Sequence, residues 1–105
     1  MDEKTLRHRG MDVYIDISLF SDFSERIDKI GGFAVKRHDC YVIAINTSRP
    51  LIVQRFVLGH ELAHVFLDHL EAPRQISVKD MEREANKAAW DYYRAYRDDN
   101  TMLYI

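Results

Sequence analysis

One long apolar stretch near the middle of the chain constrains the fold most. Residues 51–70 predict a helix with apolar side chains around almost its whole circumference, and a helix of that kind is buried in a core. One stripe of this helix is nevertheless polar, and its members are His60, Glu61, His64 and Asp68. At 100° per residue they fall within about 100° of one another. Because a buried polar group without a partner costs about 1–3 kcal/mol, the stripe needs a partner, and a metal ion would supply one.

Composition indicates a single globular domain over residues 1–105. The chain has 15 Lys and Arg against 17 Asp and Glu, a net charge of −2, and 47% hydrophobic residues, which suits one core of ordinary size. The near-neutral charge gives no reason to expect direct binding to nucleic acid. The single cysteine, Cys40, fits a reducing compartment, and no apolar run approaches the ~20 residues that span a membrane. We therefore expect a cytoplasmic protein without a membrane segment.

Local patterns predict an α+β domain. The predicted elements are a strand at 12–17, a helix at 18–30, a β-hairpin of strands 33–37 and 40–46, the central helix at 51–70 and a last helix at 78–97. We expect a small antiparallel three-stranded sheet that packs on the buried central helix and on the last helix. Residues 1–10 are expected to be loose, residues 98–105 to form a C-terminal tail, and His8 and His38 to lie on the surface.

The polar stripe contains an HExxH motif that runs from His60 to His64. Residues i and i+4 project one above the other on a helix, so both imidazoles can reach one cation at about 2.0–2.1 Å. Glu61 lies about 100° further around the helix, where it can reach a water on that metal and act as a general base. Gly59 costs about 1 kcal/mol relative to Ala inside a helix, which suggests a close approach by another backbone or a substrate. The alternative is a pair of core histidines that are hydrogen-bonded to their neighbours.

A catalytic zinc site also needs a third protein ligand and one open position. The candidates lie in the last helix, where Glu82 and Asn86 share a face. Glu82 can bind the metal while Asn86 orients a ligand imidazole without touching the ion, and Glu84 can pair with Lys87 on the surface. The helical wheel alone leaves the choice open, because Glu82 and Glu84 flank the alanine face about equally.

Three segments of the chain resemble the ImmA/IrrE metallopeptidases. They are Ile45-Asn46, the run from Arg55 to His64, and Glu82-Arg83-Glu84-Ala85-Asn86. The resemblance implies a gluzincin-like minimal domain in which two His and one Glu hold zinc. The ligand Glu of related gluzincins stands four residues before an Asp or Asn, which maps to Glu82 with Asn86. The chain differs from the family at Ala63, where Gly is common, and at His69, which is displaced by one from a His that often follows the motif.

The leading hypothesis is a zinc-dependent endopeptidase that hydrolyses a peptide bond in a protein. One zinc ion is held by His60, His64 and Glu82, with Mn and Fe as alternative metals, and Glu61 is the catalytic base. The resemblance implies a helix-turn-helix repressor of a mobile element or stress response as substrate. An exposed edge of strand 40–46, or of its hairpin partner, would align an extended peptide.

Two other functions compete with this hypothesis. The first is a non-catalytic, metal-containing protein-binding module of the same fold, in which Asp68 or a tail residue closes the open metal position. The second is an α+β interaction protein in which the polar stripe is hydrogen-bonded internally. The oligomeric state stays open at this point.

Overall fold

The computed structural model describes residues 6–16, 31–73 and 76–99, with side chains up to residue 94. The predicted helix at 18–30 and all but the first two residues of the tail lie outside these residues. The described strands are β1 (Leu6–His8), β2 (Met11–Asp16), β3 (Gly32–Lys36) and β4 (Cys40–Ile45), and the helices are α1 (Leu51–Phe66) and α2 (Val78–Asp99). The predicted hairpin and both predicted helices in this part of the chain are confirmed, with small shifts at their ends.

The sheet differs from the prediction in two ways. It has four strands in the order β1-β2-β4-β3, and β2 runs parallel to β4, with Val13 opposite Tyr41. The prediction of three antiparallel strands was therefore wrong. Pairing between β2 and β4 joins distant segments, and no local pattern in the sequence specifies which strand lies next to which.

The segment expected to be loose contains β1. Arg9 and Gly10 both have positive φ angles, 51° and 76°, and such a two-residue turn closes a tight antiparallel hairpin. The turn places His8 opposite Met11 and pairs β1 with β2. The sequence of β1 is polar on both sides of Leu6, so it lacks the alternation by which a half-buried strand is recognised.

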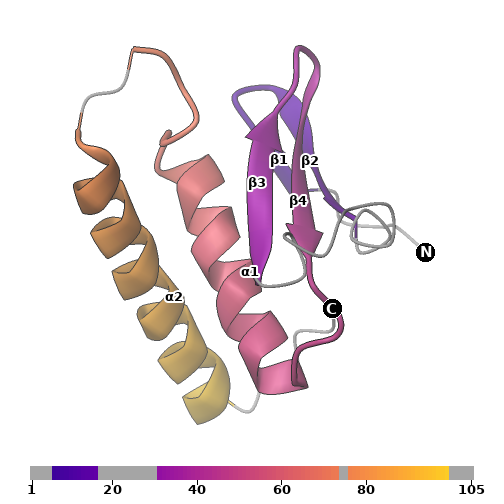
Figure 1. Cartoon of the computed structure of the whole chain (residues 1–105), viewed down its shortest axis with the longest axis vertical. Coiled ribbons are helices and arrows are strands. Elements are labelled where there is room, and N and C mark those ends of the chain that lie inside the picture. Colours follow the sequence, from indigo (N-terminus) through magenta and orange to yellow (C-terminus); the bar gives the residue numbers. More distant parts are fainter. Residues whose placement is uncertain (1–5, 17–30, 74–75, 100–105) are drawn as a thin grey trace.

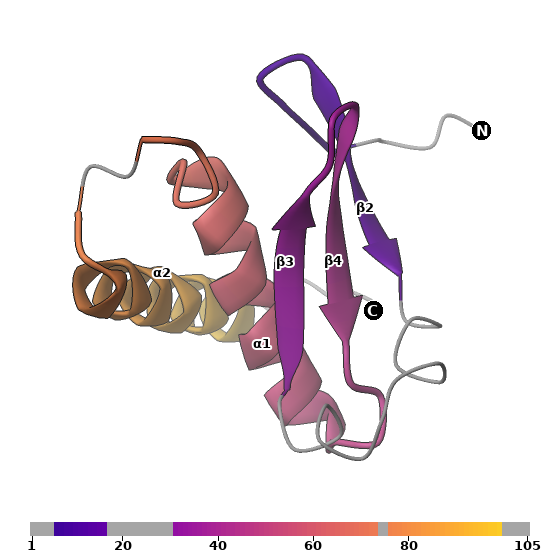
Figure 2. The same ribbon diagram turned by 45° about the horizontal axis from the view of Figure 1, so that its top comes forward.

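The elements form three layers, in which α1 lies between the sheet and α2 (Figures 1 and 2). The core consists of Val13, Tyr41, Ile43, Ile45, Leu58 and Val65. Tyr41, Ile43 and Ile45 alternate along β4 and therefore share the face that meets α1. On its other side α1 contacts α2, whose Ala85 and Ala89 are fully buried. This double packing explains why α1 is apolar on two sides.

The predicted burial of the central helix holds only for its middle. Leu51, Ile52 and Val53 in its first turn and Phe66 in its last turn are exposed. Both ends of the helix therefore lie at the surface of the described part of the chain. None of the helices in the described part of the chain combines the length and the apolar character that a bilayer crossing requires.

The central helix ends at Phe66 rather than at residue 70, because the chain turns at Asp68. Asp68 has a left-handed φ of 62°. Its N–H donates to the carbonyl of Val65 (3.2 Å), and the N–H of His69 donates to the carbonyl of His64 (3.0 Å). These two bonds form a Schellman motif, in which the left-handed residue after the C-cap and the residue that follows it donate their N–H groups to carbonyl groups of the last helical turn. Because of this turn, His69 does not continue the helical spacing of α1. Its backbone N–H is bonded to the last turn of the helix instead.

The last helix begins where the sequence predicted. The N–H of Asp80 donates to Oγ of Ser77 at 3.1 Å, so Ser77 caps the helix by satisfying one of its unpaired N–H groups. Met81, one turn into the helix, is buried. The cap therefore sets the start of the helix and with it the turn that carries Glu82.

Candidate metal centre

Three side chains from two helices meet at one point between α1 and α2. Nε2 of His60 lies 3.0 Å from Nε2 of His64 and 3.0 Å from Oε2 of Glu82. Nε2 of His64 lies 3.3 Å from Oε1 of Glu82. Ligand atoms at about 2.0–2.1 Å from a tetrahedral cation are themselves spaced about 3.4 Å apart. The separations are therefore close to those around one ion.

The protons on these side chains also suit a cation. The carbonyl oxygen of Asn86 lies 2.8 Å from Nδ1 of His60, and a carbonyl oxygen only accepts, so Nδ1 of His60 carries the proton. The lone pair of Nε2 then faces His64 and Glu82. Burial, followed by the proximity of His60, lowers the pKa of His64 and favours its neutral, metal-binding form. A cluster of lone pairs and a carboxylate is a donor set typical of zinc.

Small residues let the two helices approach one another here. Ala85 and Ala89 on α2 are fully buried against α1. A Cβ atom added to Gly59 would lie 3.4 Å from Cα of Ala89 and 3.4 Å from Cδ1 of Tyr92. The close approach expected at Gly59 is thus made by α2, at an ordinary van der Waals separation. This packing brings Glu82 within reach of both imidazoles.

Glu61 lies beside this cluster, one residue along α1. One carboxylate oxygen of Glu61, one ring nitrogen of His60 and one ring nitrogen of His64 all lie within 4.8 Å of one another. Only 6% of Glu61 is exposed. Burial, and then the negative charge of Glu82, raise the pKa of Glu61 to about 7 in the metal-free protein. A carboxylate that titrates near neutral pH can both take up and release a proton there.

The cluster opens into a cleft of about 610 Å³. One wall is formed by Gly32, Phe33 and Ala34 of β3, and the opposite wall by α1 and the first turns of α2. Among the described strands, β3 pairs with β4 alone and is therefore the edge strand beside the cleft. The 40–46 segment lies inside the sheet, so only the alternative that placed the edge on its hairpin partner agrees with the structure.

The hydrogen bonds at both ends of the hairpin show which groups of β3 face outward. Arg37 N–H donates to Cys40 (2.7 Å), and Asn46 N–H donates to Gly31 (2.8 Å). In an antiparallel pair the residues between such positions alternate. The N–H and C=O groups of Gly32 and Ala34 therefore point away from β4, toward the side where the cleft lies.

Two residues beside the cluster, His69 and Glu84, make a contact that was not predicted from the sequence. His69 is buried, and its Nδ1 lies 2.9 Å from Nδ1 of His64, while its Nε2 lies 2.8 Å from Oε1 of Glu84. The expected pair between Glu84 and Lys87 was wrong, because Lys87 pairs with Asp91 at 3.1 Å. The signal that was missed is the left-handed turn after α1, since a helix drawn through residue 70 places His69 elsewhere.

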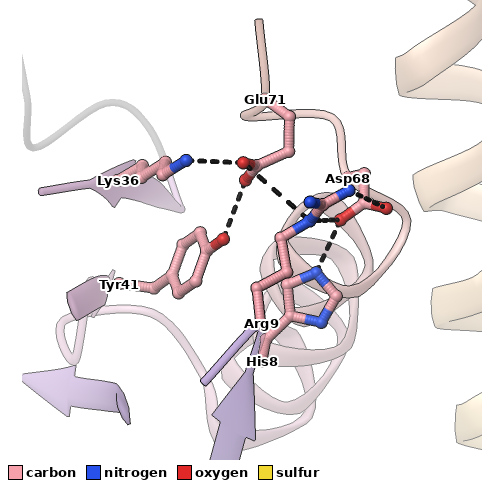
Figure 3. Close-up of polar contacts among 6 residues, drawn as sticks. All are labelled: His8, Arg9, Lys36, Tyr41, Asp68 and Glu71. Carbon is pink, nitrogen blue, oxygen red and sulfur yellow. Dashed lines mark hydrogen bonds and ion pairs between the residues drawn. The ribbon is translucent and has the colours of Figure 1, made fainter. Parts of the chain in front are cut away.

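Asp68, the candidate for a further metal ligand, is instead bound by the β1–β2 turn (Figure 3). Its carboxylate accepts hydrogen bonds from His8 (2.6 Å) and from Nε and Nη2 of Arg9 (2.9 and 3.1 Å). His8 was expected at the surface, but only 17% of its side chain is exposed, and its ring packs against Tyr41 and Phe66. His38 is exposed, as predicted.

Glu71 extends the same network to the β3–β4 hairpin (Figure 3). Its carboxylate accepts from the Tyr41 hydroxyl at 2.8 Å and pairs with Lys36 and Arg9. The segment that follows α1 is therefore tied to strands from both hairpins.

Comparison with known proteins agrees with this geometry. A family model described as the IrrE N-terminal-like domain (Peptidase_M78) matches residues 20–92, which is more than half of the chain and includes the HExxH motif and Glu82. No curated protein and no solved structure matches the chain. Given the extent of this match, the chain belongs to the IrrE N-terminal-like family of metallopeptidases.

Proposed function

We propose that the protein is a zinc-dependent endopeptidase that hydrolyses peptide bonds in a protein substrate. The observation that carries this proposal is the convergence of two imidazole nitrogens and a carboxylate at separations of 3.0–3.3 Å. Beside them lies a buried carboxylate, Glu61, and the group lines a cleft with a strand edge on its far wall. These are the parts that metal-assisted peptide hydrolysis requires.

In this proposal His60, His64 and Glu82 hold the ion, and Asn86 orients His60 through its Nδ1 proton. A bound zinc ion supplies Lewis acidity, which acidifies a water and polarises the scissile carbonyl. Glu61 accepts the proton of the attacking water and later delivers it to the leaving amine. Burial raises the pKa of Glu61 above its ordinary value, which makes its carboxylate a better proton acceptor.

The edge of β3 aligns the substrate. An extended peptide that adds to this edge would bond to the outward N–H and C=O groups of Gly32 and Ala34. Its carbonyl groups would then cross the cleft toward the candidate metal ligands. Membership of the family favours a helix-turn-helix repressor as the physiological substrate and the cytoplasm as the compartment.

The non-catalytic alternative receives no support from Asp68. A closed site needs a fourth protein ligand, and the carboxylate of Asp68 is engaged with Arg9 and His8 instead. The tail that was the other candidate lies outside the described residues.

Replacing Glu61 tests the proposal. The zinc-loaded protein and its Glu61→Gln variant are compared on a peptide library derived from a digested bacterial proteome, with zinc content measured for both. We expect Glu61→Gln to retain zinc and to lose cleavage by about 10²–10⁴-fold, and Glu82→Gln to lose zinc as well. Asp91→Asn, on the exposed side of α2, is the matched control and should behave as wild type. Cleavage that survives Glu61→Gln, or a wild-type protein that binds no zinc, contradicts the proposal.

A further inference from the structure

We propose that Glu84 and His69 form a positioning pair that fixes the proton and the orientation of His64, so that its Nε2 lone pair faces the metal. This inference rests on the proposed zinc site. It assigns a role to two residues that touch neither the ion nor the substrate.

The contacts run in one line from the surface to the site. Glu84 Oε1 lies 2.8 Å from Nε2 of His69, and Nδ1 of His69 lies 2.9 Å from Nδ1 of His64. The remaining nitrogen of His64, Nε2, is the one that lies 3.0 Å from His60 and 3.3 Å from Glu82. The side chain of His69 is only 4% exposed, whereas that of Glu84 is 53% exposed. The carboxylate therefore lies at the outer end of the line.

With His69 neutral, the carboxylate of Glu84 decides the positions of the protons along the whole line. An ionised carboxylate can only accept, so Nε2 of His69 carries the proton that faces Glu84. A neutral His69 then has its lone pair on Nδ1, which accepts the Nδ1 proton of His64. This leaves Nε2 of His64 without a proton and able to bind a cation. Removing the carboxylate would allow the opposite order, with a proton on Nε2 of His64 where the ligand lone pair must be.

The backbone holds the same two histidines together. The N–H of His69 donates to the carbonyl of His64 within the Schellman motif, so His69 is bonded to residue 64 through both main chain and side chain. Asp68, whose left-handed conformation closes that motif, is anchored by Arg9 and His8 (Figure 3). The ring of His69 is thus confined before any ion binds.

One helix then organises both ligand imidazoles. Glu82 reaches the ion position, Asn86 accepts from His60, and Glu84 acts on His64 through His69. All three lie within two turns of α2. The docking of α2 against α1 would therefore place the third ligand, Glu82, and would set the tautomers of both His60 and His64.

Zinc affinity measured by competition with a chelator tests the pair. Outer partners of metal-bound histidines commonly contribute 10–100-fold in affinity, so we expect Glu84→Gln and His69→Phe each to weaken zinc binding by about that factor. Asp91→Asn removes an exposed carboxylate from the same helix and should change affinity by less than about 2-fold. Because Glu84 is half exposed, its replacement leaves the core intact, and His69→Gln serves as a second variant if His69→Phe does not fold.

A double mutant separates positioning from a general effect of charge. If Glu84 acts through His69, adding Glu84→Gln to His69→Phe, or to His69→Gln, has little further effect on zinc affinity. A simple electrostatic contribution from Glu84 would persist in either background and would overturn the inference. Imidazole ¹⁵N shifts of His64 in the metal-free protein give a second readout: we expect the Nδ1-protonated tautomer in wild type and a mixture in Glu84→Gln.

The two proposals fail in different ways. A wild-type protein without zinc affinity removes the proposed function. A wild-type protein that binds zinc, with Glu84→Gln equal to it in affinity and in the tautomer of His64, removes only the positioning pair.

Discussion

His60, His64 and Glu82 each direct a possible metal-ligand atom at the same point, and residues outside the cluster hold the two imidazoles there. Asn86 accepts the Nδ1 proton of His60, and His69 lies at the corresponding nitrogen of His64. Glu61 differs from them in its burial, which makes its charge costly in the metal-free protein. A cation at this point would have two imidazole nitrogens and a carboxylate as ligands, with the buried carboxyl group of Glu61 beside it.

Glu61 should make the stability of the metal-free protein depend on pH. Its folded-state pKa of about 7 lies above the ordinary value of 4.5. Its contribution is therefore fully present below pH 4.5 and is lost as the pH rises through 7. We expect the unfolding free energy of wild type, relative to Glu61→Gln, to fall by about 3 kcal/mol over this interval. Urea denaturation in the presence of a chelator measures it, and parallel pH profiles for the two proteins would contradict the prediction.

Packing between elements decides where the chain can accept a side chain. The α1–α2 contact leaves ordinary van der Waals room at Gly59, whereas the β3–β4 pair leaves none at Gly32. A Cβ atom on Gly32 would lie 2.5 Å from the carbonyl oxygen of Ala44 and 2.7 Å from Cγ1 of Val57. The packing of β3 therefore requires glycine at position 32, whereas the contact between α1 and α2 leaves room for a Cβ atom at position 59.

Alanine at these two glycines should have opposite effects on stability. We expect Gly59→Ala to stabilise the protein by up to about 1 kcal/mol, because alanine favours a helix and the added methyl fits. Gly32→Ala should destabilise it by about 1–3 kcal/mol, because backbone or Val57 must move. Denaturant unfolding of both variants checks the signs, and a loss of stability in Gly59→Ala would show that the helices are closer than the structure indicates.

The edge of β3 supports a prediction about substrate binding. Proline at Ala34 removes an outward N–H while leaving the bonds to β4, and edge strands tolerate proline at such positions. Losing one hydrogen bond of about 0.5–1.5 kcal/mol should lower kcat/KM by about 2–10-fold. Ala34→Gly retains the N–H and is the control. Equal kcat/KM in Ala34→Pro and Ala34→Gly, at equal zinc content, would place the substrate elsewhere.

Across the whole molecule, the candidate metal site joins the two helical layers, and the network around Glu71 and Asp68 joins both hairpins to the end of α1 (Figure 3). The central helix is thus fixed at its end by the sheet and on its outer side by α2. Zinc would therefore hold α1 to α2, whereas the ionic network holds the end of α1 to the sheet.

Zinc should raise the thermal stability of the entire domain, because the ion would bind α1 and α2 together only in the folded state. At a free zinc concentration 100 times Kd, binding adds about 2.7 kcal/mol, which corresponds to a rise in Tm of about 10 °C or more for a domain of this size. Differential scanning calorimetry with and without a chelator measures the shift. Glu82→Gln should reduce the shift strongly, and an equal shift in that variant would show that Glu82 is not a ligand.

The Asp68 contact should contribute stability at neutral pH and lose it in acid. Hydrogen bonds from Arg9 and then from His8 hold the pKa of Asp68 well below its ordinary value of 3.8. The contribution is therefore present above that value and disappears as the pH falls through the lower, folded-state pKa. Asp68→Asn keeps a residue that tolerates the left-handed turn. We expect it to be less stable than wild type at pH 7, with a difference that shrinks on acidification; a difference independent of pH would contradict this.

Much of the candidate site could be predicted because it depends on short spacings. The HExxH motif places two imidazoles on one helix, and Ser77 sets the start of the helix that carries Glu82. The β3–β4 hairpin was also predicted from its local pattern. The family resemblance, rather than the helical wheel, selected Glu82 over Glu84, and the structure places Glu82 at the imidazoles and Glu84 at His69.

The sequence by itself determined the helices, the hairpin and the pair of histidines, because periodicity and turn chemistry act between residues a few positions apart. Only the tertiary structure decided the parallel pairing of β2 with β4, the edge position of β3 and the contact of His69 with His64 and Glu84. Each of these depends on contacts between distant segments or on the left-handed turn at Asp68, and their free energies appear only when the layers pack together.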